Sequence, residues 1–335
     1  MILVIYLIAI NLLALFMYGI DKRKAKNEKY RISEMALITV AVLGGAIGAF
    51  LGMKIFHHKT RKKKFYITVP LFLILWCVFI VFCLYQNYHL VTTEYSYEVR
   101  EDCESISDSG LTIVQISDLH NQFFGFKQER LLKRIEKCNP DIIIVTGDVV
   151  DGAHTCYPLA YNFFEGAVKI APVYYVTGNH EVSLYGDRFD KFIKDIDELG
   201  VHFMDGLMEE CEIGKGDKKS SILIAGAADN SNVSDYGWSD DKRLKVLLSH
   251  EPVRYEEYET TGADLVFVGD IHGGQIIIPG KGGLLSPEIE FFPELYMGEH
   301  TFGDMTMYIS RGLGNSVLPV RVNNYPEVVK VEVKR

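Results

Sequence analysis

The run Leu111-Thr112-Ile113-Val114-Gln115-Ile116 passes directly into Ser117-Asp118-Leu119-His120. The first run is apolar and β-branched, which predicts a buried strand. In an extended segment the side chains of Asp118 and His120 point the same way, because side-chain direction repeats every second residue. A carboxylate and an imidazole placed in this way can hold one metal ion. An isolated Asp-x-His is weak evidence, however, and is more often part of a surface loop.

The same arrangement, a buried strand followed by polar ligands, recurs along the second half of the chain. Five further apolar runs predict buried strands: 142–146, 173–177, 222–225, 245–249 and 265–268. All but 222–225 lead into polar motifs, which are Gly147-Asp148, Gly178-Asn179-His180-Glu181, Ser249-His250-Glu251-Pro252 and Gly269-Asp270-Ile271-His272-Gly273-Gly274-Gln275. Because loops at strand ends carry catalytic groups in α/β proteins, we expect these motifs to form one site.

The motifs supply carboxylate, imidazole and amide oxygen atoms that bind metal ions. The candidate metal ligands are Asp118, His120, Asp148, Asn179, His250, Asp270 and His272. The two oxygens of Asp148 can bridge two ions, and the neighbouring His180 is free to act on a substrate. Two adjacent cations can activate a water and hold a phosphoryl group in the same step, so the sequence predicts a hydrolase.

In this order the motifs resemble those of the calcineurin-like metallophosphoesterases, from about Leu111 to the C-terminus. Ser117-Asp118-Leu119-His120 and His272-Gly273-Gly274-Gln275 are similar to the bacterial membrane-associated branch of that family. So are three tail motifs, Ser310-Arg311-Gly312-Leu313-Gly314, Pro319-Val320-Arg321 and Tyr325-Pro326-Glu327. The resemblance implies an α/β (α+β) fold, a four-layer αββα sandwich of two mixed sheets. The strand pattern alone fits a doubly wound sheet equally well.

The resemblance also implies a role for each ligand. It puts Asp118, His120 and His272 on a first metal, Asp148 between the metals, and Asn179 and His250 on the second. The family usually has His-x-His at the last motif, whereas this chain has Asp270 at the first of these positions. A carboxylate is a harder ligand, which favours manganese, iron or magnesium over zinc.

The expected reaction is attack on phosphorus by a hydroxide held between two divalent ions, drawn from Mn, Fe, Zn and Mg. Asp148 and His180 are the predicted catalytic residues, and His180 is expected to protonate the leaving oxygen or stabilise its charge. Asp151 and Glu181 are candidates to orient metal ligands, with a solvated loop carboxylate as the equal alternative. Arg311 is a candidate contact for a substrate phosphate.

Charge divides the chain into two parts. Residues 1–99 carry 12 Lys and Arg against 5 Asp and Glu, whereas residues 100–335 carry 23 against 39. An acidic catalytic half argues against DNA or RNA as the main partner, since binding to a phosphate backbone draws on clustered Lys and Arg. The cysteines show no C-x-x-C spacing and leave the redox compartment open. Oligomeric state is also left open.

Three apolar stretches, Ile2–Ile20, Met35–Met53 and Ile67–Tyr85, have the length of about 20 residues that crosses a bilayer as a helix. We therefore expect a membrane region over 1–90, a connecting segment over 91–110 and a metallophosphoesterase domain over 111–335. The first stretch has no cleavage site for a signal peptidase and predicts an uncleaved anchor. The order of motifs over roughly the first 85 residues, including Gly19-Ile20-Asp21-Lys22 and His58-Lys59-Thr60, resembles a small bacterial membrane domain of unknown function.

The orientation of the membrane region depends on two basic loops, 21–34 and 54–64. Both favour the cytoplasm, yet they lie on opposite sides if the middle stretch spans. Its small-residue run, Gly44-Gly45-Ala46-Ile47-Gly48-Ala49, is typical of close helix packing and less often of a segment that enters and returns. Basic residues precede the third stretch and none follows it closely, which places the catalytic domain outside the cytoplasm.

The sequence thus predicts a multi-pass protein of the cell membrane that hydrolyses a phosphate ester or pyrophosphate. A lipid-linked or sugar-nucleotide substrate fits a site close to a bilayer. The alternative is a membrane sensor or scaffold that keeps the metal-binding fold without turnover.

Overall fold

The computed structural model describes residues 2–103, 105–214, 219–229, 233, 236–238, 240–287, 289–315 and 320–335. Pro319, part of one tail motif, lies outside the described residues. The chain divides into two compact units, Met1–Tyr85 and Gln86–Arg335.

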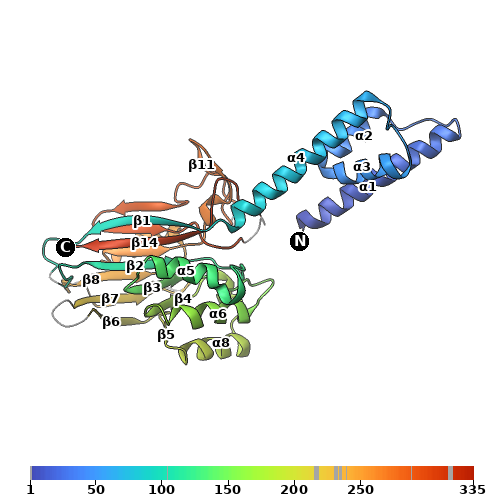
Figure 1. The fold of residues 1–335 in the computed structure, drawn as a ribbon. Helices are drawn as coiled ribbons and strands as arrows, with labels where there is room; N and C mark the ends of the chain where they lie inside the picture. Colours follow the sequence, from blue (N-terminus) through green and yellow to red (C-terminus); the bar gives the residue numbers. More distant parts are fainter. Residues whose placement is uncertain are drawn as a thin grey trace. The chain divides into compact units, whose positions relative to one another are not determined.

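The second unit contains two six-stranded mixed sheets (Figure 1). The first has the strand order β1 (Val91–Glu98), β14 (Glu327–Lys334), β2 (Leu111–Ile116), β3 (Ile142–Thr146), β4 (Val173–Val176) and β5 (Val201–Phe203). The second has the order β12 (Gly298–Phe302), β13 (Met305–Ile309), β9 (Leu265–Val268), β8 (Leu244–Leu248), β7 (Ser220–Gly226) and β6 (Met208–Ile213). A separate pair joins β10 (Ile277–Ile278) to β11 (Gly282–Gly283). All six predicted strands are present within a residue or two at their ends.

Three apolar layers hold these sheets. One lies between the first sheet and helices α5 (Glu129–Lys137), α6 (Tyr157–Ala167) and α8 (Asp187–Asp197). A second lies between the two sheets, where alternate residues such as Ile113 and Ile144 meet Ile224 and Val246. A third covers the far face of the second sheet with Trp238 and with α9 (Tyr255–Thr260). Strands β2, β3, β8 and β9 are mostly apolar because layers on both faces bury them. The expected αββα arrangement of two mixed sheets is confirmed.

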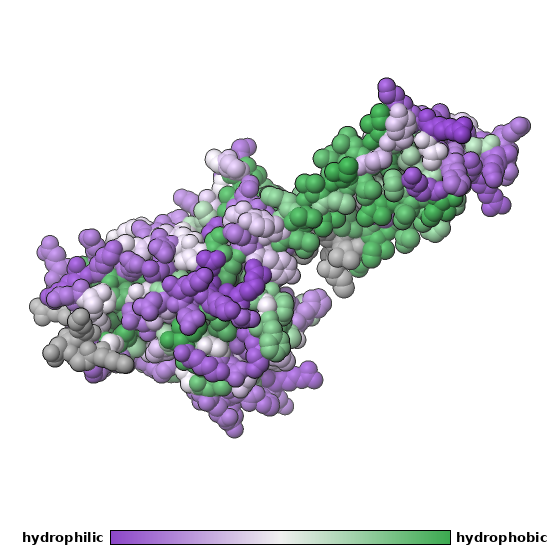
Figure 2. All heavy atoms as spheres, in the orientation of Figure 1, coloured by the Kyte–Doolittle hydropathy of each residue, from purple (hydrophilic) through white to green (hydrophobic). Residues whose placement is uncertain are grey.

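The first unit contains α1 (Ile2–Lys26), α2 (Glu34–Val40), α3 (Ala46–Ile55) and most of α4 (Lys63–Tyr88). Three helical segments are long and apolar enough to cross a membrane: Ile5–Lys26, Glu34–Ile55 and Lys63–Tyr88. Figure 2 shows apolar side chains along the outside of these helices. Apolar side chains left exposed over a whole helix surface indicate association with a membrane.

The middle of these segments folds back at Gly44, whose φ of 112° suits glycine. Near the end of α1, Asp21 accepts a hydrogen bond from the backbone N–H of Ile32 (3.0 Å) and contacts His58 Nε2 (2.7 Å). These two residues flank the segment on either side. A straight helix of 22 residues would hold its ends about 33 Å apart. Both ends of the segment therefore lie at the same end of α1.

Polar side chains of α1 and α4 satisfy the backbone at this turn. The bonds are Asn11 Nδ2 to Gly44 O (3.0 Å), Gly48 N to Asn11 Oδ1 (2.8 Å), Tyr6 Oη to Leu43 O (2.7 Å) and Trp76 Nε1 to Val42 O (3.0 Å). A helix break in an apolar environment is tolerated when protein groups pair its backbone. The sequence suggested that these small residues allow either close helix packing or a segment that enters and returns, and they do both. Gly44 makes the turn, and Gly48 packs against α1.

Candidate metal centre

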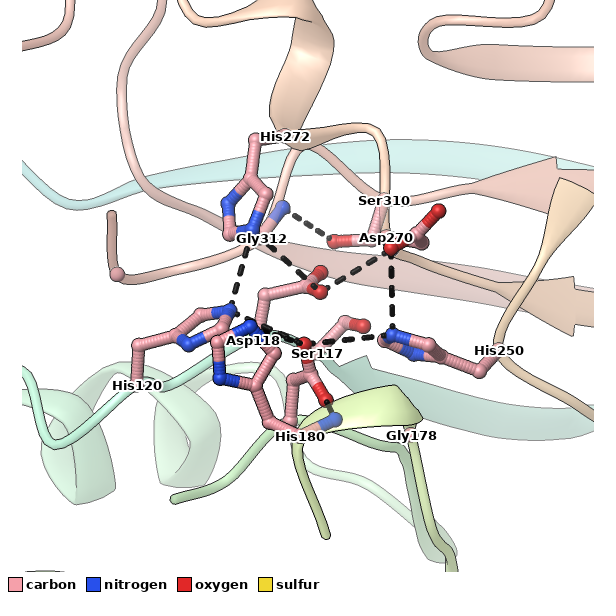
Figure 3. Close-up of polar contacts among 12 residues, drawn as sticks. Ser117, Asp118, His120, Gly178, His180, His250, Asp270, His272, Ser310 and Gly312 are labelled. Atoms are coloured by element: carbon pink, nitrogen blue, oxygen red, sulfur yellow. Dashed lines mark hydrogen bonds and ion pairs between the residues drawn. The ribbon is translucent and has the colours of Figure 1, made fainter. Parts of the chain in front are cut away.

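The predicted ligands meet where strands of both sheets end. β2 leads to Asp118 and His120, β3 to Asp148, β4 to Asn179 and His180, β8 to His250, and β9 to Asp270 and His272. The labelled side chains of Asp118, His120, His180, His250, Asp270 and His272 converge from the two sheets (Figure 3), and most of the predicted ligands are buried. Sequence-distant motifs thus form one polar centre in an otherwise apolar interior.

Two groups of predicted ligands share this centre. One group is Asp118, His120 and His272, and another is Asp118, Asp148 and His250, with ligand atoms within 4.8 Å of one another in each. His180 forms a third group of this kind with His120 and Asp148. Asp148 Oδ2 lies 3.2 Å from His120 Nε2 and 3.4 Å from His250 Nε2. One carboxylate oxygen therefore faces both groups, which is the place that a bridging ligand would take.

The Asp270 carboxylate lies on the His250 side of the centre. Its Oδ1 is 3.6 Å from His250 Nε2, and its backbone N–H donates to Asp118 Oδ1 (3.1 Å). The residue is only 5% exposed. The carboxylate that stands where the family usually has histidine thus remains within reach of the second group of ligands.

Several buried ligand atoms lack a hydrogen-bond partner within the described residues. They are Asp118 Oδ2, Asn179 Oδ1, His120 Nδ1 and His250 Nε2. An unpaired polar atom in a protein interior is costly, and each such atom in a native structure calls for an explanation. Three of these atoms are lone-pair donors suited to hard or borderline divalent cations. The residues present therefore fit a metal centre.

The pKa shifts of His250 and Asp148 also fit a metal centre. Burial opposes protonation of His250, but the charges of Asp148, Asp270 and Asp118 outweigh it and raise the pKa of the imidazole well above its usual value. Burial likewise opposes ionisation of Asp148, yet His250 and His120 lower the pKa of that carboxyl well below its usual value. The carboxylates thus attract positive charge, which cations can supply in place of protons.

The backbone at the centre is unusual. Five of the predicted ligands have positive φ: Asp118 (51°), His120 (41°), Asp148 (52°), Asp270 (70°) and His272 (50°). Residues other than glycine rarely adopt this region, and such conformations concentrate at functional sites. The tight turns after the strands aim these side chains at a common point.

Glu181 holds the loops in place from behind. It is fully buried, and its two oxygens accept backbone N–H groups of Asp148 (2.8 Å), Val150 (3.0 Å) and Gly178 (3.0 Å). Burial, followed by the charge of Asp148, raises the pKa of Glu181 to about 8. The three N–H bonds act in the opposite direction, since they favour the carboxylate. Glu181 therefore positions the Asp148 loop rather than binding the metal itself.

Two further contacts orient imidazoles. His250 Nδ1 lies 2.7 Å from the carbonyl of Thr146, so Nδ1–H donates to it and Nε2 faces the centre. Arg321 is fully buried with Nη2 3.4 Å from His272 Nδ1. Burial, then His120 and Arg321, lower the pKa of His272 well below its usual value, which keeps the imidazole neutral.

His180 lies at the more open side of the centre. The backbone N–H of Gly152 donates to its Nδ1 (2.9 Å), so the neutral ring carries its proton on Nε2. That nitrogen lies 3.9 Å from Asp148 Oδ2, and the side chain is 25% exposed. The ring can therefore offer an Nε2–H to a molecule that enters the centre.

The close approach of the loops requires glycine at position 178. A Cβ there would lie 2.7 Å from His250 Nε2 and would also overlap a carboxylate oxygen of Asp148. Any side chain at this position would separate the ligands of the two sheets. The Gly-Asn-His-Glu motif is thus determined by packing as well as by chemistry.

Sequence reasoning singled out one arginine and missed another. The Arg311 guanidinium pairs with Glu327 (2.6 Å) and contacts Thr93 (3.2 Å), and its contact with a substrate phosphate stays a prediction. Arg321, by contrast, supports His272, and the sequence offered no signal for it beyond its place in a tail motif. Asp151 lies at the edge, 4.0 Å from His120 Nδ1.

Comparison with known proteins agrees with this geometry. Residues 111–274 match the family model of the calcineurin-like phosphoesterases, and residues 11–65 match that of a protein family of unknown function, DUF1294. The uncharacterized metallophosphoesterase YkoQ of Bacillus subtilis is 27% identical over 221 residues, covering 65% of this chain and 82% of YkoQ.

Two other relatives cover different parts of the chain. The uncharacterized protein YsdA of Bacillus subtilis is 46% identical over 80 residues, which are 24% of this chain and 90% of YsdA. The phosphodiesterase YaeI of Escherichia coli is 23% identical over 230 residues, covering 66% of this chain and 81% of YaeI. The chain therefore carries a calcineurin-like metallophosphoesterase domain, preceded by a DUF1294 domain.

Proposed function

We propose that this protein is a membrane-anchored phosphoesterase that uses two divalent metal ions. The position of Asp148 carries the proposal. Its Oδ2 faces His120 on one side and His250 on the other, and unpaired buried atoms of Asp118 and Asn179 point to cations in the same centre. Family membership supports a phosphoester substrate, and the phosphodiesterase YaeI among the relatives favours a diester or pyrophosphate.

The ligands divide between two ions in the way that the family resemblance implies. Asp118, His120 and His272 would hold one ion, whereas Asn179, His250 and Asp270 would hold the other, with Asp148 between them. Two divalent cations in such a centre activate water and neutralise charge on the phosphoryl oxygens. The protein supplies a fixed arrangement of ligands, which Glu181 and Arg321 maintain.

His180 acts on the leaving group. Gly152 fixes the tautomer with the proton on Nε2, and that proton faces the centre. Burial lowers the pKa of His180, so the neutral ring is the form present near pH 7. We therefore assign it the donation of a hydrogen bond from Nε2–H to the departing oxygen, which stabilises the charge that develops there.

Apolar residues around the centre favour a substrate with lipid chains. Phe123 and Phe126, in the loop after His120, are 52% and 77% exposed. Ile289 and Phe291, in the loop after His272, are 70% and 66% exposed. Leu284 N ties this second loop to Gly274 O (3.2 Å), beside the metal ligands. Exposed apolar groups on segments that follow the metal ligands suit a phosphate ester attached to a hydrophobic tail.

Two residues near the start of the second unit bond to residues of the phosphoesterase domain. Asn87 Oδ1 accepts the backbone N–H of Arg321 (2.8 Å), and the carbonyl of Tyr88 accepts Arg130 Nη2 (2.8 Å). The first of these bonds holds Arg321, which lies against His272.

The fold of the first unit supports a catalytic domain outside the cytoplasm. All twelve Lys and Arg of residues 1–99 lie in the two basic loops, 21–34 and 54–64. Because the segment between these loops folds back at Gly44, they come together at one end of α1. Both can then obey the positive-inside rule, with α1 and α4 as the spanning helices. A fluorescent protein that matures only in the cytoplasm, fused after Arg335, should stay dark, and fluorescence would contradict this orientation.

Hydrolysis is tested with full-length protein stripped of metal and reloaded with Mn, Fe, Zn or Mg. We expect cleavage of bis(p-nitrophenyl) phosphate that depends on the added metal and falls by about a thousandfold or more in Asp148→Asn, since several kcal/mol of charge stabilisation are lost. Absence of turnover on this diester, on p-nitrophenyl phosphate and on a lipid-linked pyrophosphate would favour the scaffold alternative.

The lipid preference is tested separately. Ile289→Gln combined with Phe291→Gln should lower turnover of the lipid-linked pyrophosphate and leave that of the soluble diester unchanged. Leu207→Gln is the matched control, because Leu207 is 52% exposed but belongs to neither loop. Equal effects of the two variants on both substrates would contradict a lipid-binding role for these loops.

A further inference from the structure

A second polar cavity lies in the first unit, away from every predicted metal ligand. Its volume is about 540 Å³. The residues that line it are Lys22, Arg31, His57, His58, Lys59, Thr60, Arg61 and Lys62. All except Thr60 carry a cationic or imidazole side chain. A cavity lined by positive side chains attracts a negatively charged ligand, because the surrounding low-dielectric protein strengthens their electric field.

The fold assembles this cavity from two distant loops. Lys22 lies near the end of α1 and Arg31 in the segment between α1 and α2, whereas residues 57–62 join α3 to α4. They meet because the α2–α3 segment turns back at Gly44, so that its beginning and its end both lie beside Asp21 of α1. The cavity is thus a product of the same turn that settles the arrangement of the helices.

A buried ion cluster forms the base of the cavity. Asp21 is fully buried and contacts Arg31 Nη2 (3.1 Å) and His58 Nε2 (2.7 Å). The Lys59 side chain is only 3% exposed, with Nζ 2.7 Å from Glu34 Oε1 and 3.8 Å from Asp21 Oδ2. Burying charges costs several kcal/mol per ion unless partners and hydrogen bonds offset it. A network of this kind fixes side chains that would otherwise move freely.

The carboxylates do not neutralise the cations. Lys22, Arg31, Lys59, Arg61 and Lys62 face the cavity, against the two carboxylates of the cluster, Asp21 and Glu34. The Arg61 side chain makes no ion pair or hydrogen bond within the described residues, and Lys22 Nζ donates to a backbone carbonyl, that of His57 (3.3 Å). Arg31 is 43% exposed at its side chain and keeps further N–H donors for a ligand.

Membrane orientation alone does not explain this arrangement. The positive-inside effect depends on the number of Lys and Arg near the ends of a span. It requires neither a shared cavity nor a buried carboxylate that holds an arginine and a histidine in place. Arg23 and Lys63 would serve orientation equally well, and neither lines the cavity.

We propose that this cavity binds a phosphate group. Its guanidinium groups can form paired hydrogen bonds to phosphate oxygens, and its ammonium groups add point charges around them. The phosphate can belong to a lipid headgroup at the membrane surface or to a soluble anion. The site is distinct from the metal centre, since it is formed by the first unit, and it gives the DUF1294 domain a binding role.

Full-length protein in nanodiscs of zwitterionic phosphatidylcholine provides the test. The soluble probe is inorganic phosphate, measured by titration calorimetry. The lipid probe is phosphatidylglycerol added to the nanodisc and counted by native mass spectrometry. The cavity variant is Lys22→Gln with Arg61→Gln. The control variant is Arg23→Gln with Lys63→Gln, which removes the same charge from the same two segments.

We expect the cavity variant to weaken binding of at least one probe by tenfold or more, and the control variant by less than twofold. A response to inorganic phosphate identifies a soluble anion, and a response to phosphatidylglycerol alone identifies a lipid headgroup. The variant Lys22→Arg with Arg61→Lys should retain binding. Both probes failing to bind, or equal losses in the cavity and control variants, would overturn the proposal. Hydrolysis of the soluble diester should be unchanged in all variants, which separates this result from failure of the proposed enzyme.

Discussion

The two units of this protein both bury carboxylates, but they treat them differently. In the first unit Asp21 finds all its partners within the chain: Arg31, His58 and the backbone of Ile32. In the second unit Asp118 and Asn179 keep buried oxygens that find no hydrogen-bond partner among the residues that the structure describes. A buried charge that is fully paired indicates a structural cluster, whereas unpaired ligand atoms around a common point indicate a cation-binding site.

Next to Asp148→Asn, the largest effect on turnover is expected from His180→Ala. Removal of the Nε2–H should lower kcat by about 10²- to 10⁴-fold on an ester with a poor leaving group. The loss should be much smaller on a p-nitrophenyl ester, whose leaving group needs little help. Metal content, measured by mass spectrometry, should stay the same. Equal losses on both esters would show that His180 does not act on the leaving oxygen.

A smaller effect is expected from Glu181→Gln. The amide replaces one acceptor oxygen with an NH₂ group that faces a backbone N–H donor, so the Asp148 loop should shift. Metal affinity should fall by roughly 10- to 100-fold, as is typical for residues that orient ligands. Isothermal titration with Mn²⁺ measures this, and Glu165→Gln, at a half-buried surface position, is the control. Unchanged affinity would remove Glu181 from the support of the centre.

Asp270→His should change metal preference more than rate. It restores the imidazole usual in the family, and the softer ligand should raise the zinc to manganese ratio of bound metal by several-fold. Turnover should stay within about tenfold of the original when the preferred metal is supplied, because other ligands still hold each ion. An unchanged metal ratio would mean that Asp270 does not ligate.

Asp21→Asn completes the comparison. Breaking a buried pair by removing one partner's charge costs about 3–5 kcal/mol, so the first unit should unfold more readily. Metal content and hydrolysis of a soluble diester should change by less than twofold. Thermal unfolding in detergent and metal analysis of the same sample measure both. Loss of metal in this variant would contradict the separation between a paired cluster and a metal centre.

The sequence predicted the centre better than the frame around it. Asp118, Asp148 and His250 could be placed because each follows a short apolar strand, a local pattern that survives in any sheet arrangement. The insertion of β14 between β1 and β2 could not be predicted, because pairing of residues more than 200 positions apart leaves no local pattern. The division into two sheets came from the family resemblance and not from the strand pattern.

Local sequence patterns also do not predict the turn at Gly44 or the different contacts of Arg311 and Arg321. An apolar stretch of helical length predicts one helix, and only the contacts of Asp21 with both flanking segments show that it folds back. Arg311 and Arg321 have similar surroundings in sequence, yet Glu327 pairs with the first and His272 lies against the second. Tertiary contacts decide such roles.

The most direct test of the central claim is the number of metal ions bound per chain. Purified full-length protein should hold two divalent ions per chain by inductively coupled plasma mass spectrometry, and Asp148→Asn should hold one or none. Two ions in both proteins would remove Asp148 from its bridging role. One ion or none in the unaltered protein, after loading with Mn, Fe, Zn and Mg in turn, would contradict the binuclear centre.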